Sequence, residues 1–280
     1  MKKILVIVLA AGLILAAGCS APTEEGPQSG IPGGDEPGIR VEISCPVLEE
    51  AVRSEILKPE GDLYSEDLWD VYYLTLRGDG PIRLEGLEYA KNLTYLSISR
   101  SEIPSLEPIA ALPELAVLSV SYSEIQGPIV FSHPQAFTRM SFIDTLIGDI
   151  SFMADMVNME ELTMTDAGIS DLSPLQGMTG LKRLHARGNN IESLAALAGK
   201  QDMESLDLQG NQVLDIEPLA DLGRLEYLVL SYNPVTNLKP LENLDRLQEL
   251  RVYQNHDVKH LIFDHVRLLE QKGVDVYYHQ

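Results

Sequence analysis

The stretch Leu206–Asn211, which reads LDLQGN, returns along the chain at a fixed step of 22 residues. The step leads forward to Leu228–Asn233 (LVLSYN) and back to Leu184–Asn189 (LHARGN). Extended both ways, it meets an apolar residue, here called the anchor, nine times in succession: Leu74, Leu96, Leu118, Met140, Leu162, Leu184, Leu206, Leu228 and Leu250. A second apolar residue stands two positions after each anchor. A repeat of this length indicates a solenoid, whose stacked units bury a shared core.

The pattern L-x-L-x-x-N with apolar residues at later steps of three resembles the leucine-rich repeat. The 22-residue length and the phrases Leu172–Leu175, Ile216–Leu219 and Leu238–Leu241 resemble the internalin-type repeats of Gram-positive surface proteins. The resemblance runs from Val41 to the C-terminus. It implies an α/β leucine-rich-repeat solenoid, with a curved parallel β-sheet on the concave side and short 3-10 or irregular turns on the convex side. It says less about function, because these repeats bind many unlike partners.

The chain divides into five segments. Residues 1–18 resemble a secretory signal segment, because a basic start precedes an apolar stretch, Ile4–Ala17, that is short for a membrane span. Residues 19–40 are rich in glycine, proline and acids and predict a flexible linker. Residues 41–73 predict a helical N-terminal cap, residues 74–255 the repeats, and residues 256–280 a cap made of a helix and a last strand.

The end of the first segment, Leu15–Cys19 (LAAGC), resembles the lipobox of bacterial lipoproteins. The resemblance implies that Cys19 becomes the mature N-terminus and carries fatty acyl chains such as palmitate. Two acyl chains hold a protein stably on a membrane. The protein is therefore expected on the cell membrane, lipid-anchored and exposed outside the cytoplasm. Ala16 departs from the pattern, since leucine is commonest there, and the alternative is a plain signal segment in which Cys19 has no role.

Charge and cysteine content limit the classes of partner. The net charge is −21, and without Lys2 and Lys3 the chain has 19 basic against 42 acidic residues, or −23. Such a chain repels nucleic acid, so no nucleic-acid partner is expected. Two cysteines do not make a disulfide framework, and Cys45 is expected to pack in the N-terminal cap.

The residue five positions after the anchor changes along the chain. It is asparagine in the later repeats, where an amide can satisfy backbone groups of its own coil and the next. It is Asp79, Ser101, Ser123, Thr145 and Ala167 in the earlier ones, so we expect the first half to be less regular. We also expect a local bulge at Pro128, which replaces a core leucine, and core positions for the methionines between Met140 and Met178.

No catalytic constellation is recognised, and the sequence predicts a protein that is not an enzyme and needs no cofactor or metal. The best metal-binding candidate is His256, His260 and His265, which are more simply interpreted as solvent-facing or capping residues. Asp149, Asp171 and Asp215 share one register and predict caps of short turns, with a calcium ladder as the alternative.

Side chains that alternate with the buried pair point to the concave face. We count five such sites per repeat: the two residues before the anchor, the one after it, and the third and fourth after it. Together these sites hold seven of 11 tyrosines, six of 12 arginines and one of nine lysines. Tyrosine and arginine with little lysine is typical of protein interfaces. The alternative is that tyrosine favours strands and that arginines pair with neighbouring glutamates. The candidate contact residues are Tyr73, Tyr95, Arg139, Arg183, His185, Arg187, Tyr227, Arg251 and Tyr253.

The pattern suggests two aromatic patches, one near Tyr95 and one near Tyr253, on either side of a basic centre around Arg183. We therefore predict a monomer, held to a membrane by a lipid anchor, that binds a protein partner through its concave face. Binding of a cell-wall glycan or glycopeptide is the alternative, because tyrosines also stack on sugars.

Overall fold

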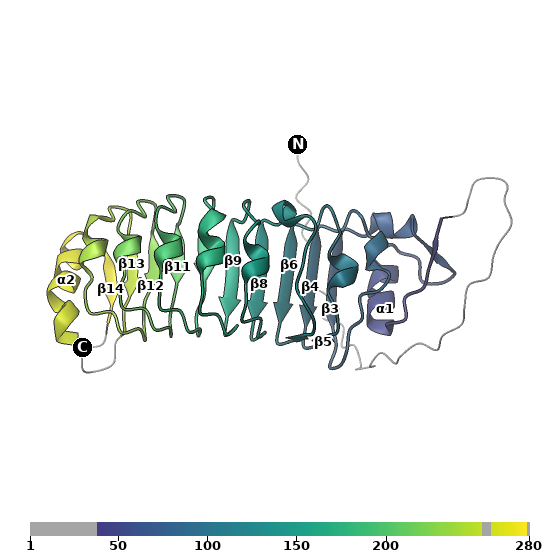
Figure 1. Ribbon diagram of the computed structural model, residues 1–280, viewed down its shortest axis with the longest axis horizontal. Coiled ribbons are helices and arrows are strands. Elements are labelled where there is room, and N and C mark those ends of the chain that lie inside the picture. Colours follow the sequence, from purple (N-terminus) through teal and green to yellow (C-terminus); the bar gives the residue numbers. More distant parts are fainter. Residues whose placement is uncertain (1–37, 254–258, 279–280) are drawn as a thin grey trace.

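The computed structural model describes residues 38–253 and 259–278. Its elements follow one another in a single row, from a helical cap at one end to a helix-and-strand cap at the other (Figure 1). A ten-stranded sheet runs along the row in the order β14-β13-β12-β11-β10-β9-β8-β6-β4-β3. Its strands are β3 (Tyr73–Arg77), β4 (Tyr95–Ser99), β6 (Val117–Ser121), β8 (Arg139–Ile143), β9 (Glu161–Thr165), β10 (Arg183–His185), β11 (Ser205–Asp207), β12 (Tyr227–Val229), β13 (Glu249–Arg251) and β14 (Asp275–Tyr277).

The sheet is parallel, and each strand pairs anchor with anchor, as in Leu184 with Leu206 and Leu206 with Leu228. The anchor and the apolar residue two positions later are buried in every repeat, and the residues between them are exposed or half-buried. One continuous core results, to which each buried side chain contributes about 1.5–3 kcal/mol. The leucine-rich-repeat solenoid is thereby confirmed, as are the core positions of the methionines from Met140 to Met178.

Short 3-10 turns form a second row against the core (Figure 1). Asp149, Asp171 and Asp215 accept hydrogen bonds of 2.8, 2.8 and 2.9 Å from the backbone N–H two residues later, which confirms their capping role. The turns are η1 (Asp67–Asp70), η2 (Leu87–Tyr89), η3 (Glu107–Ile109), η4 (Pro134–Ala136), η5 (Ser151–Met153), η6 (Ser173–Gly177), η7 (Ala195–Leu197), η8 (Glu217–Leu219) and η9 (Lys239–Asn243).

The asparagine ladder joins each coil to the one before it, where the sequence had suggested the one after. Asn211 Oδ1 accepts from Ile191 N at 3.0 Å, and Nδ2 donates to Leu208 O and to Ala186 O at 2.9 Å each. Asn189 and Asn233 make the equivalent bonds. Asn255 lies outside the described residues.

The first half is not less regular in its strands, which have five residues where β10 to β13 have three. The side chain five positions after the anchor also differs between these two groups of repeats. The amide of Asn189 reaches Ala186 O, two positions after the anchor, and diverts that carbonyl at the point where β10 ends. The shorter hydroxyl of Ser123 binds Ser121 O one residue later, so that β6 continues.

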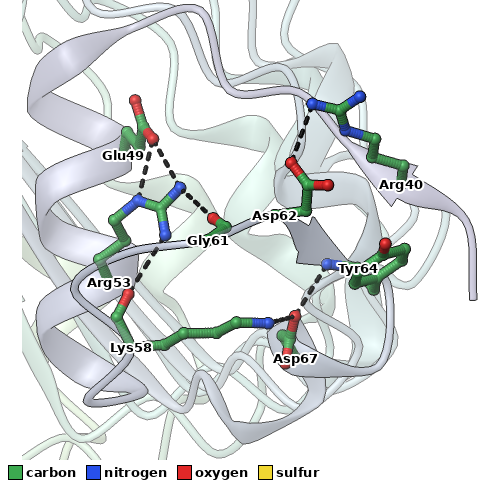
Figure 2. A network of polar contacts seen from close by, with 8 residues as sticks. All are labelled: Arg40, Glu49, Arg53, Lys58, Gly61, Asp62, Tyr64 and Asp67. Atoms are coloured by element: carbon green, nitrogen blue, oxygen red, sulfur yellow. Dashed lines mark hydrogen bonds and ion pairs between the residues drawn. The ribbon is translucent and has the colours of Figure 1, made fainter.

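The N-terminal cap is closed by charged side chains at its outer end (Figure 2). It contains α1 (Pro46–Glu55) and the antiparallel pair β1 (Arg40–Val41) and β2 (Leu63–Tyr64). Arg53 bonds Glu49 Oε1 at 2.9 Å and donates to Lys58 O and Gly61 O. Burial opposes ionisation of Asp67, but the hydrogen bonds from Lys58 Nζ and the Tyr64 N–H outweigh it and lower the pKa of that carboxyl.

Cys45, just before α1, is buried in the core as expected. Two residues beyond the end of helix α1, Leu57 has φ 56°, and the N–H of Lys58 donates to Arg53 O at 3.0 Å. This is a Schellman ending with leucine at the position that glycine normally takes.

At the other end, α2 (Lys259–Gln271) packs against η9 and β14. His265 Nδ1 lies 2.8 Å from Glu242 Oε1, so this histidine is tied to η9. His256 and the side chain of His260 lie outside the described residues, which contain no His, Cys, Asp and Glu cluster suited to a metal ion.

Lys200 occupies a core position that sequence inspection missed. It stands 22 residues after Met178 and 22 before Leu222, both fully buried, and is itself only 2% exposed. Its Nζ donates to Leu175 O at 2.8 Å and to Met178 O at 2.9 Å. Burial lowers the pKa of Lys200 to about 8.

Candidate functional site

The candidate contact residues lie on the solvent side of the ten-stranded sheet, which we call the sheet face. Alternation along the strands puts them there, because their neighbours in sequence are the buried anchors or the buried residues two positions after the anchors. Tyr73, Arg139, Arg187, Tyr227 and Arg251 are exposed, and Tyr95, Arg183, His185 and Tyr253 are half-buried. They extend from β3 to the exit of β13 and do not converge on one pocket.

The aromatic patch at the N-terminal end is smaller than the sequence suggested. Tyr73 is 61% exposed, and its ring lies 6.4 Å from that of Tyr95 on the next strand. Tyr72 is exposed beside them. Tyr122, the fourth residue after its anchor, is also a sheet-face site by its spacing, but it has φ 52° at the exit of β6 and lines a groove along the edge of the sheet instead.

The expected basic centre is neutralised by glutamates from neighbouring coils. Arg183 Nη2 lies 2.6 Å from Glu161 Oε1, and its Nη1 lies 3.3 Å from Glu204 Oε2. Arg139 also reaches Glu161, at 3.5 Å, across the paired strands β8 and β9. Pairs this exposed contribute about 0–1 kcal/mol to stability each. Their main effect is a sheet face with little net charge on an acidic molecule.

The aromatic patch at the C-terminal end extends one strand beyond the repeats. Arg251 lies over the ring of Tyr277, with Cζ 5.6 Å from the centroid, and both tyrosines Tyr227 and Tyr232 are exposed nearby along β12 and its exit. Tyr277 was missed because Leu250 pairs with Val276, a step of 26 residues instead of 22. Alternating residues in the last strand were the signal that could have placed it.

The described residues do not include a helix long and apolar enough to cross a membrane.

The sheet face offers tyrosine rings, arginines and paired carboxylates on a rigid sheet. These groups suit recognition of a surface.

Comparison with known proteins supports the fold. No protein-family model matches the chain, and no curated protein does. Among solved structures, internalin C2 from Listeria monocytogenes is 27% identical with a TM-score of 0.69, over 74% of this chain and 93% of that chain.

Two receptors share the fold at lower identity. The plant peptide hormone receptor RGFR1, in complex with RGF2, is 14% identical with a TM-score of 0.58, over 76% of this chain and 37% of that one. TLR13, in a complex with ssRNA13, is 22% identical with a TM-score of 0.56, over 67% of this chain and 30% of that one. At these identities the likeness concerns the fold alone.

Proposed function

We propose that this chain binds a protein partner through its sheet face. The observation that carries the proposal is the set of exposed tyrosines on the strands, above all Tyr73 and Tyr227. Exposed aromatic rings on rigid strands give large contact areas at low conformational cost. The likeness to an internalin and to receptors agrees with this role.

The electrostatics of the face support the same function. The paired Arg139, Glu161, Arg183 and Glu204 leave hydrogen-bonding groups on the surface without the strong negative charge of the whole molecule. A partner therefore meets less repulsion here than on the rest of the surface.

Photo-crosslinking tests this function. A crosslinking residue replaces Tyr73 or Tyr227, and Glu217 on the opposite row of turns serves as the control position. We expect both sheet-face probes to capture the same protein, and Tyr73→Ser and Tyr227→Ser each to weaken its binding about tenfold. Equal capture at Glu217 would refute the proposal. Capture of wall material that survives protease treatment would favour the glycan alternative.

We further propose that Cys19, which lies outside the described residues, carries the lipid anchor and holds the protein on the outer side of a membrane. The motif Leu15–Cys19 supports this location. Labelled palmitate should be incorporated by the unchanged protein and lost in Cys19→Ser, which should also leave the detergent phase. Equal labelling and partitioning of the two would rule the anchor out.

A further inference from the structure

The core of the solenoid is open at one place. The residue seven positions after the anchor is fully buried in most repeats, as with Ile103, Ile169 and Ile191. Ile125 and Ile147 hold the same register on consecutive coils but are only half-buried. Together they line a pocket of about 320 Å³ between the coil 125–129 and the coil 146–152.

The cause of the opening is the irregular repeat that the sequence had indicated. The residue ten positions after the anchor is buried in the two flanking coils, where it is Leu106 and Ile150. In the coil between them the same position is Pro128, which is exposed. On the sheet side the repeat is regular, because β6 and β8 pair without a break. The departure is thus confined to the side away from the strands.

Aromatic packing closes only the floor of the opening. The ring of Phe152 lies 6.3 Å from Phe131 and 6.4 Å from Phe142, and Phe152 also lines the pocket. The rim is mixed: it has Leu146, which is 78% exposed, beside the polar side chains of Asp149 and Ser151. The pocket volume is at the low end of the range of about 300–1,000 Å³ for ligand pockets and suits one large apolar side chain.

An edge strand borders the pocket. Strands β5 (Glu102–Ile103) and β7 (Glu124–Ile125) form a two-stranded parallel sheet at the strand-exit edge, where Figure 1 labels β5. Within the described residues β7 has a strand partner on that side only. The next coil does not extend the sheet, because the N–H groups of Ile147 and Gly148 both bond Ala167 O. An extended peptide can use such an edge.

The surroundings of the pocket are acidic. An adjoining groove of about 380 Å³ is lined by four carboxylates, Asp79, Glu102, Glu124 and Asp144, and one cation, Arg100. From residue 101 to residue 181 the sequence has 11 acidic residues, no lysine and one arginine. That arginine, Arg139, and one of the acids, Glu161, pair with each other on the sheet face, so neither changes the charge around the pocket.

From this combination we infer a second interaction surface, separate from the sheet face. It takes an extended segment of a partner protein that places a large apolar side chain in the pocket of Ile125, Leu146 and Phe152 and lays lysines or arginines along the carboxylate groove. The apolar pocket selects the anchoring side chain, and the groove selects the sign of the charge.

Selection from a random peptide library tests this surface. Peptides are selected on the purified protein after depletion on Leu146→Lys, which changes an exposed side chain and should not disturb folding. We expect the enriched peptides to combine a leucine, isoleucine or phenylalanine with lysines or arginines. Enrichment of acidic peptides, or no enrichment among the peptides that remain after depletion, would overturn the inference.

Binding of one synthetic enriched peptide then maps the site. Leu146→Lys should weaken binding about tenfold or more, and Leu214→Lys, on another coil at 59% exposure, should not. Glu124→Lys should weaken binding and reduce its dependence on salt. Tyr227→Ser should have no effect, which separates this surface from the sheet face. Equal effects of Leu146→Lys and Leu214→Lys would show that the peptide does not bind in the pocket. Weaker binding to Tyr227→Ser would show that it binds the sheet face instead.

Discussion

Replacing Lys200 by methionine is expected to stabilise the protein. Lys200 is 2% exposed at a register where the preceding coils carry Met156 and Met178. Two of the three carbonyls that it contacts do not depend on it, because Leu175 O accepts from Met178 N and Met178 O accepts from Leu181 N, and the third, Gln176 O, is a weaker contact at 3.5 Å that is not fully buried. Methionine at position 200 therefore removes a buried charge without leaving these acceptors unpaired.

The pKa of Lys200 gives the size of the stabilisation expected for Lys200→Met. Burial lowers it from 10.5 to about 8, which at 1.36 kcal/mol per pKa unit makes the charged form about 3 kcal/mol less favourable in the folded state than in the unfolded state. Below pH 8 both states are protonated and the whole cost is present. Between pH 8 and 10.5 the unfolded state binds more protons, so the stability of the unchanged protein rises with pH.

Urea denaturation at pH 7 and pH 10 measures both effects. At pH 7 the free energy of unfolding of Lys200→Met should exceed that of the unchanged protein by up to about 3 kcal/mol. Most of this difference should disappear at pH 10. Lys239→Met, at an exposed position in η9, is the control and should change stability little at either pH. A Lys200→Met protein that is less stable at pH 7, or an advantage that does not shrink with pH, would refute the reasoning.

Four further changes test other parts of the structure. Asn211→Leu leaves the N–H of Ile191 unpaired and removes one of the two amide donors from Ala186 O and from Leu208 O, so it should cost about 1–3 kcal/mol of unfolding free energy, whereas exposed Asn190→Leu should cost little. Leu206→Asp puts an unpaired charge in the core and should unfold the neighbouring repeats, so a melting curve like that of the parent would contradict the register. Asp67→Asn should lower the melting temperature at pH 7. The pKa of Asp67 is below 3.8 in the folded protein, so this difference in melting temperature should become smaller as the pH drops through that pKa. A difference that stays constant with pH would argue against the ion pair. Leu57→Gly should raise stability by about 1 kcal/mol by relieving a left-handed leucine that is 86% exposed, while Leu57→Ala, which keeps the strain, should not.

The sequence alone determined the ladder of the solenoid. Every coil must place its anchor beside the anchor of the next, so burial imposes a strict 22-residue period that can be counted without coordinates, as between Leu184 and Leu206. Local rules also sufficed for the turns: Asp171 caps the turn that begins two residues later.

Only the tertiary structure decided what lies between coils. Glu161 pairs with both Arg139 and Arg183 because the three side chains come from adjacent strands, and a single repeat does not show which glutamate comes within reach. The pocket beside Ile125 opens through the absence of one core side chain, and its size depends on how far Phe152 fills the space. Periodicity records which residues face inward, whereas voids and ion pairs depend on distances between residues about one repeat apart, which sequence spacing does not specify.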